Sequence, residues 1–244
     1  MATVNSANNF KPNVNRLTEF RVNLVVKYIV YCYLLMIEEG KKYDFSKRGK
    51  LQQEDFLRNG LIDDYLSKKR CKDFYKQQIS DNPNVEIYFN KEENQIYTIN
   101  DVSADDYIDI SVKETKLSEI LSETSEDEIK LAFECKRIKV SQDYKEYVKD
   151  IHKFANRPFT TYRLPFEGQI AFIENPLFTH QTVYIEINKL LNVDTKIITV
   201  KLLENKTIHS NFDGCYHSIH KRNHNDKANF SIYHLMFDYS KIIN

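Results

Sequence analysis

Two carboxylates and a lysine are spaced so that neighbouring extended strands would bring them together. In residues 131–138, the alternation of side chains along a strand puts Glu134 and Lys136 on one face. The same period of two in residues 107–112 puts Asp109 on the face opposite an apolar stripe. If the two strands are adjacent, Asp109 faces the Glu-Lys pair. Two carboxylates and an ammonium in a polar notch of an apolar sheet suit a hard divalent cation and a phosphodiester.

An Asp on one strand and a Glu-x-Lys on the next resemble the signature of the PD-(D/E)XK nuclease superfamily, which has the restriction-endonuclease-like fold. The motifs similar to one bacterial branch are, in order, F-E-C-K-R-I at 133–138, Y-V at 147–148, I-H-K-F at 151–154, S-I-H-K-R at 218–222 and H-L-M-F at 234–237. Their order over residues 50–244 is more specific than any single motif. The chain departs from the branch where Asp109 lacks a preceding Pro, Lys153 replaces the usual Arg, and Asn156-Arg-Pro replaces a Gly-containing turn.

The resemblance implies an α/β fold: a restriction-endonuclease-like mixed central β-sheet flanked by helices, with an extra N-terminal helix. It implies a Mg²⁺-dependent endonuclease that hydrolyses the phosphodiester bonds of DNA, in restriction or phage defence. Mn²⁺ is expected to substitute for Mg²⁺. A homodimer is expected if both DNA strands are cut.

The resemblance also assigns roles to individual residues. Asp109 and Glu134 are the predicted Mg²⁺ ligands, together with the backbone carbonyl of Cys135. Lys136 would orient the attacking water or stabilise the developing negative charge; because a lysine with its ordinary pKa of about 10.4 is a cation at neutral pH, the electrostatic role is favoured. Glu54 resembles a further carboxylate supplied by the helix before the sheet. Alternatively, Glu54 is an acidic residue that the helix dipole favours in a first turn.

Three other interpretations stay open. In the first, Asp109, Glu134 and Lys136 have no catalytic role and lie on an exposed strand face with one Glu-Lys ion pair, worth less than about 1 kcal/mol. A nucleic-acid-binding or interaction module that kept the fold and lost cleavage would have Asp109, Glu134 and Lys136 apart from one another. A nuclease of RNA or of structured DNA would share the site and differ in the shape of its groove.

Candidate nucleic-acid contacts lie further along the chain. The predicted helix over residues 142–155 carries a ladder of lysines spaced by four, namely Lys145, Lys149 and Lys153. Such a ladder can neutralise backbone phosphates, which set affinity without reading sequence. The alternative is that Glu146 and Asp150 pair with these lysines in an ordinary solvated surface. The resemblance additionally suggests that His220 and Arg222 contact phosphate or lie beside the site.

A histidine cluster near the C-terminus raises a second metal hypothesis. Its members are Cys215, His217, His220, His224 and His234. Their spacing lacks the C-x-x-C and H-x-x-x-H ligand pairs of structural zinc sites, so zinc is disfavoured. No Walker loop, GxGxxG or GxSxG motif is present, and no nucleotide cofactor is expected.

Composition bounds the class of protein. A chain of 244 residues is long enough for one large domain, which we predict for residues 14–244 after a disordered tail over 1–13. A formal net charge of zero means that any DNA-binding surface must be a local patch. Scattered cysteines and a polar N-terminus without a signal-peptide pattern favour the cytoplasm. The apolar run 24–37 is shorter than the about 20 residues of a membrane span, so no membrane is expected.

Apolar periodicity predicts the order of the elements. The helical segment over residues 14–45 is apolar on most sides, which favours either the core or a subunit interface, and we predict an interface. The acidic connection 113–128 should repel DNA. The other predicted helices are 52–69, 118–121, 142–155 and 178–191, and the predicted strands are 85–89 and 96–99 around a turn at 90–94, then 107–112, 131–138, 168–173, 196–203, 215–220 and 230–239.

Overall fold

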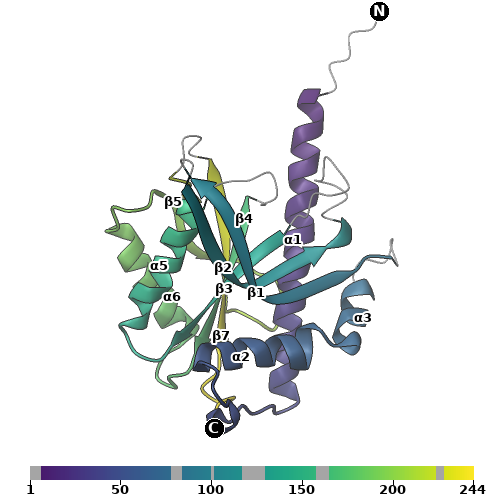
Figure 1. The fold of residues 1–244 in the computed structure, drawn as a ribbon, viewed down its shortest axis with the longest axis vertical. Coiled ribbons are helices and arrows are strands. Elements are labelled where there is room, and N and C mark those ends of the chain that lie inside the picture. Colours follow the sequence, from purple (N-terminus) through teal and green to yellow (C-terminus); the bar gives the residue numbers. More distant parts are fainter. Residues whose placement is uncertain (1–6, 78–83, 100–101, 117–129, 158–164, 224–227) are drawn as a thin grey trace, which may run out of the picture.

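The computed structural model describes residues 7–77, 84–99, 102–116, 130–157, 165–223 and 228–244. Seven strands in these residues form one mixed sheet (Figure 1). The strands are β1 Ile87–Ile99, β2 Val102–Glu114, β3 Lys130–Ile138, β4 Phe166–Ile173, β5 Thr199–Asn205, β6 Cys215–Lys221 and β7 Asn229–Asp238. Their order is β1-β2-β3-β4-β7-β6-β5. The pairs β3-β4 and β4-β7 are parallel, and the other neighbours are antiparallel.

Helices flank this sheet, which confirms the predicted α/β architecture (Figure 1). The helices are α1 Ala7–Glu38, α2 Gln53–Leu61, α3 Lys69–Gln77, α5 Asp143–Asn156 and α6 His180–Asn192. α1 and α3 share a core with one face of the sheet, to which Phe133 and Cys135 belong. α5 and α6 share a second core with the opposite face, to which Ile138 belongs. Because side chains alternate along a strand, Glu134 and Lys136 lie on the α5 side.

The N-terminal helix is a core helix of the chain itself. Val22, Val25, Val26 and Ile29 are fully buried in the first core, which accounts for a helix that is apolar on most sides. By length and composition its segment Arg16–Glu38 would also span a membrane, but 56% of the most apolar window is buried inside the protein, as in a core helix. The apolar side predicted as a subunit interface is therefore used within the chain, and a homodimer stays a prediction without an assigned surface.

Some predicted element boundaries are wrong. The turn predicted at residues 90–94 is absent, because β1 continues from Ile87 to Ile99 and pairs with β2 along that length. β1 lies at the edge of the sheet, where polar side chains can face water within a regular strand. The polar run at residues 90–94 therefore does not require a turn. Glu92 alone leaves the ladder, with a φ of 48°.

Two helical predictions also differ from the structure, and a third is not tested by it. α1 begins at Ala7, so part of the predicted tail is helical, which costs little once the rest of the helix has formed. The predicted helix 52–69 is α2 followed by the π-helical turn Ile62–Leu66. The predicted helix 118–121 lies outside the described residues.

Gly168 on β4 allows a close approach between neighbouring strands. Gly168 is paired with Phe133 on β3, and a Cβ atom at Gly168 would lie 2.1 Å from the Phe133 ring. Replacing Gly168 with Ala is therefore expected to lower the free energy of unfolding by about 1–3 kcal/mol, measured by urea denaturation. The double variant Gly168→Ala with Phe133→Leu should recover part of that loss. Additive losses would contradict the steric explanation.

Candidate active site

Asp109 and Glu134 lie on neighbouring strands at the point where β2 and β3 part. The pairing of these strands ends with Ile110 opposite Phe133, so the next positions are Asp109 and Glu134. Asp109 Oδ2 accepts a hydrogen bond of 2.8 Å from the backbone N–H of Cys135. The Asp109 carboxylate therefore reaches across to the strand that carries Glu134.

Lys136 lies between two further carboxylates from different helices. Its Nζ is 3.2 Å from Glu54 Oε1 on α2 and 3.6 Å from Asp150 Oδ2 on α5. The other Glu54 oxygen accepts a 2.9 Å hydrogen bond from the backbone N–H of Arg137. Glu54 thus joins α2 to β3 beside Lys136. Asp150 was expected only as a surface partner of the lysine ladder; its spacing of three residues from the apolar Tyr147 is the signal that it faces inward.

Protein cations surround the carboxylates. Arg157, at the end of α5, forms an ion pair with Glu134, and Lys153 Nζ is 3.2 Å from the other Glu134 oxygen. Lys153 also donates a 2.9 Å hydrogen bond to the backbone carbonyl of Tyr107. Arg58 on α2 lies 2.8 Å from Asp109 Oδ1. Lys153 therefore contacts these carboxylates and is not simply a residue of the exposed face of α5.

Burial controls the protonation of this cluster, which we define as Glu54, Asp109, Glu134, Lys136 and Asp150. Burial raises the pKa of Glu134 to about 8, and Arg157 opposes the rise without cancelling it. Burial likewise raises the pKa of Asp150 to about 6, and it raises the pKa of Glu54. Burial alone would lower the pKa of Lys136, but Asp150 and Glu54 outweigh burial, and its pKa lies above the ordinary value. The cluster thus combines three carboxylates that resist ionisation, those of Glu54, Glu134 and Asp150, with a lysine that stays charged.

The donor types suit a hard cation, although protein groups now contact the carboxylate oxygens. Among the described residues, no group of three or more His, Cys, Asp and Glu side chains is arranged to hold a metal ion. Raised carboxylate pKa values nevertheless indicate that the cluster would gain from additional positive charge. The Oε1 atom of Gln169, which is paired in register with Glu134, is buried without a hydrogen-bond partner. Mg²⁺ would suit these oxygen donors only if Arg58, Lys153 and Arg157 moved away from Asp109 and Glu134.

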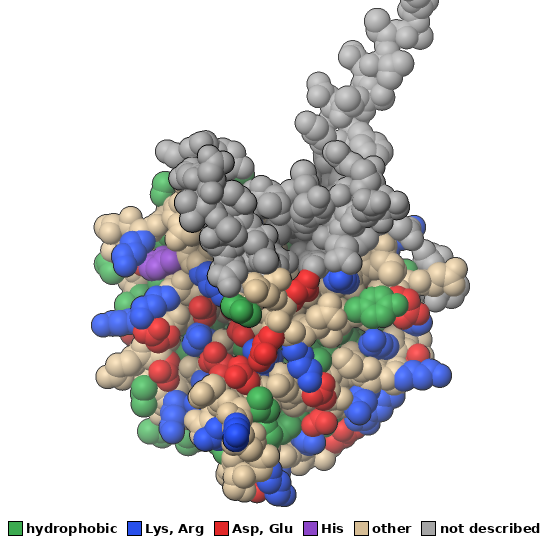
Figure 2. Space-filling model, viewed as in Figure 1, with side chains coloured by type: hydrophobic (Ala, Val, Ile, Leu, Met, Phe, Trp, Pro, Cys, Tyr) green, Lys and Arg blue, Asp and Glu red, His purple; other side chains and the backbone are tan. Residues whose placement is uncertain are grey.

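An open groove borders the cluster at Glu54 and Lys136. A groove of 420 Å³ is lined by residues of the α2 start, the end of β3 and the α5 start, among them Glu54, Lys136, Asp143 and Glu146. Figure 2 shows Asp and Glu side chains gathered near the middle of this face, with Lys and Arg on both sides. An open groove suits a polymeric substrate, whose backbone must lie across the surface.

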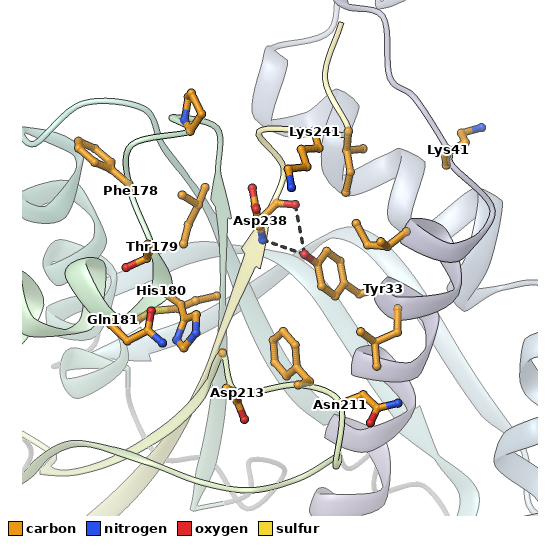
Figure 3. A pocket seen from close by; sticks show the side chains of 18 of the residues that line it. Tyr33, Lys41, Phe178, Thr179, His180, Gln181, Asn211, Asp213, Asp238 and Lys241 are labelled. Atoms are coloured by element: carbon orange, nitrogen blue, oxygen red, sulfur yellow. Dashed lines mark hydrogen bonds between the residues drawn. The ribbon is translucent and has the colours of Figure 1, made fainter.

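A second cavity, of 630 Å³, lies away from the cluster, between α1 and the start of α6 (Figure 3). Tyr33 lines it and bonds to the backbone of Asp238. His180 lines the opposite wall, and its Nδ1 is 2.7 Å from the hydroxyl of Tyr216. None of the clustered carboxylates lines this cavity.

The predicted nucleic-acid contacts fall into two groups. Lys145 and Lys149 are exposed on α5, and Lys149 pairs with Glu146 at 2.6 Å. His220 and Arg222 are buried, so the prediction that they contact phosphate is wrong, whereas the alternative that they lie beside the site is compatible with their burial. Burial also lowers the pKa of His220 to about 3, so its imidazole is neutral.

Arg222 is buried for a structural reason. Its guanidinium donates to the backbone carbonyl of Phe154 at 2.8 Å and lies 3.3 Å from Glu167. Glu167 in turn lies 3.6 Å from Arg157. Arg222 therefore supports the arginine that pairs with Glu134, instead of facing solvent.

Comparisons of the chain with protein-family models, with curated proteins and with solved structures gave no match. The fold and the site define an α/β protein with a half-buried cluster of carboxylates and a charged lysine.

The stability that Glu134 contributes to the metal-free protein is expected to fall as the pH rises from about 6.5 to about 8. Because the pKa of Glu134 is raised to about 8, the folded state keeps a proton on Glu134 that the unfolded chain has lost. The pKa of Cys71, which its hydrogen bond with Cys32 lowers to about 7, gives a contribution of opposite sign that is the same in wild type and in a Glu134 variant. The buried histidines, with lowered pKa values, contribute only below about 6.5. Urea unfolding at each pH measures the slope. Glu134→Gln should flatten it, and equal slopes in both proteins would contradict the raised pKa.

Proposed function

We propose that this protein is a Mg²⁺-dependent endonuclease of restriction-endonuclease-like fold that hydrolyses DNA phosphodiester bonds, in restriction or phage defence. The observation that carries the proposal is the convergence of Asp109 and Glu134 from neighbouring strands beside Lys136. The mixed sheet flanked by helices is compatible with that fold. The Glu-x-Lys spacing on β3 and its resemblance to the nuclease motif add support.

Each residue of the cluster has a role in this proposal. Asp109 and Glu134, with the backbone carbonyl of Cys135, would hold Mg²⁺. When bound, Mg²⁺ supplies positive charge to a phosphoryl oxygen and lowers the pKa of a water molecule. Lys136 remains protonated and stabilises negative charge on the phosphate in the transition state.

Two carboxylates hold Lys136 for that role. Glu54 and Asp150 lie on opposite helices and both contact the ammonium, so its position is fixed without a hydrogen bond from the substrate. Glu54 is itself fixed by the N–H of Arg137. We therefore assign Glu54 to the positioning of Lys136 more than to the metal.

The DNA would lie along the open groove. Lys145 and Lys149 extend from α5 on one side of the groove and can contact phosphates. The phosphate chain would then pass over Lys136. RNA or structured DNA would use the same contacts, so both are tested as substrates beside plasmid DNA.

One observation favours a second candidate function, a nucleic-acid-binding or interaction module that has lost cleavage. Both oxygens of Asp109 and both oxygens of Glu134 already contact protein donors. If Arg58, Arg157 and Lys153 stay in place when Mg²⁺ is added, the carboxylates have no oxygen free for the metal.

Supercoiled plasmid distinguishes these functions. The protein is incubated with plasmid in Mg²⁺, in Mn²⁺ and in EDTA, and parallel reactions contain RNA or branched DNA. Nicking that requires the divalent cation supports the nuclease. Retention of plasmid in a gel-shift assay without any cleavage in either cation would support the binding module and contradict the proposal.

A further inference from the structure

A row of buried polar side chains crosses the sheet beneath α5 and α6. The strand registers align Glu134 on β3 with Gln169 on β4, and Gln169 with His234 on β7. Gln169 and His234 are completely buried. On β6, Ser218 and His220 are buried in the same way and continue the row away from the carboxylate cluster.

Hydrogen bonds connect this row to α5. The hydroxyl of Tyr147 on α5 is 2.9 Å from His234 Nδ1. His234 Nε2 is 2.7 Å from Ser218 Oγ, which is 2.8 Å from His220 Nε2. His220 Nδ1 ends the row 3.1 Å from the hydroxyl of Thr199 on β5. The row thus joins α5 to three strands through side chains whose hydrogen-bonding groups satisfy one another.

Gln169 links the row to the carboxylate cluster. Its Nε2 donates a 2.9 Å hydrogen bond to the backbone carbonyl of Tyr147 and lies 3.5 Å from Asp150 Oδ2. Tyr147 and Asp150 are one helical turn apart, so both project from one side of α5. Asp150 is in turn 3.6 Å from the ammonium of Lys136. A rotation of α5 about its axis would move Asp150 and Tyr147 together.

The row is suited to holding α5 in place and not to moving protons. The connection from Gln169 to Tyr147 passes through a backbone carbonyl, which cannot relay a proton. Burial lowers the pKa values of His220 and His234, so both imidazoles are neutral and add no charge to the site. Apolar contacts alone, which are non-directional, would let α5 turn or slide on the sheet. Directional hydrogen bonds remove that freedom.

We propose that Tyr147, His234, Ser218 and Gln169 form a positioning network, which fixes the rotation of α5 so that Asp150 stays on Lys136 and Lys153 stays on Glu134. The expected effect of this network on Mg²⁺ binding rests on the proposed nuclease function, but the positioning of α5 does not. Loss of one hydroxyl from the network would leave the carboxylates in the chain while changing their arrangement. The four residues are positioning residues, because none of them touches the reacting atoms.

Tyr147→Phe and Ser218→Ala each remove a single hydroxyl and test the network. Calorimetry without DNA is expected to show Mg²⁺ binding weakened about 10-fold or more in both variants. The matched control is Ile187→Val, which deletes one methyl group from α6 in the same core. Ile187→Val should lower the unfolding midpoint by a similar amount and leave Mg²⁺ affinity unchanged. An equal loss of Mg²⁺ affinity in Ile187→Val would show that the affinity depends only on overall stability, and it would overturn the proposal.

A second readout does not depend on nuclease function. The NMR signal of the Lys136 ammonium reports its contact with Asp150, and it should shift in Tyr147→Phe but not in Ile187→Val. If the wild-type protein binds no Mg²⁺ while this shift occurs, the nuclease proposal fails and the network stands. If the signal stays unchanged in Tyr147→Phe, the network is contradicted whatever the metal does.

Discussion

Replacing Glu134 with Gln is expected to slow Mg²⁺-dependent DNA cleavage by a factor of about 10² to 10³. The amide keeps the size of the side chain but removes the negative charge that a bound cation requires. Lys136→Met should have an effect of similar size, because it removes the ammonium that Glu54 and Asp150 hold. Single-turnover cleavage of a labelled duplex measures the chemical step without the contribution of product release.

Glu186→Gln provides the matched control for Glu134→Gln. Glu186 lies on the surface of α6 and pairs with Lys189. It is outside both the carboxylate cluster and the groove, so its replacement should leave the rate within about 2-fold. If Glu134→Gln, Lys136→Met and Glu186→Gln all cleave at the wild-type rate, the nuclease activity does not come from this site.

Replacing Arg157 with Leu is expected to lower the free energy of unfolding by about 3–5 kcal/mol. Arg157 is 1% exposed and pairs with Glu134 and Glu167, which are themselves buried. Its loss would leave these two buried carboxylates with less compensating charge, from Lys153 at Glu134 and from Arg222 at Glu167. Urea denaturation at pH of about 7.5 measures the effect, since there the carboxylates of the unfolded chain are ionised.

An exposed ion pair serves as the comparison for Arg157. Lys189 pairs with Glu186 on the surface of α6 at 2.6 Å, and Lys189→Leu should change the free energy of unfolding by less than about 1 kcal/mol. Adding Glu167→Gln to Arg157→Leu should recover part of the loss, because one of the two carboxylates that lost a cation is replaced by a neutral amide. A loss below about 1 kcal/mol for Arg157→Leu would show that water reaches these carboxylates in its absence.

The strands around the carboxylate cluster were the most predictable part of the fold. Alternation of polar and apolar residues gives the correct faces for Glu134 and Cys135, since this pattern depends only on strand geometry. The apolar stripe of α5 was predicted for the same reason: Tyr144, Tyr147 and Val148 are buried at helical spacing. Local periodicity is visible in a sequence because burial repeats with the period of the element.

Other features depend on contacts between distant segments and were not predictable from local pattern. Arg222 looks like an exposed basic residue until Glu167 and the Phe154 carbonyl, both remote in sequence, are placed beside it. Asp150 looks like a partner for nearby lysines until β3 brings Lys136 to it. A polar residue can be buried only where the fold supplies hydrogen-bond partners, and the local sequence does not show which distant residues those partners are.

The position of β7 has a consequence for how the chain is made. β7 follows every other strand of the described sheet in sequence, yet it lies between β4 and β6. A nascent chain leaves the ribosome with its N-terminal part first. Until residues Asn229–Asp238 emerge, β4 and the hairpin of β5 and β6 lack the strand that lies between them, so their facing edges are unpaired. Synthesis of this protein should therefore be sensitive to chaperone supply, and release of its C-terminal strand should trigger closure of the whole sheet.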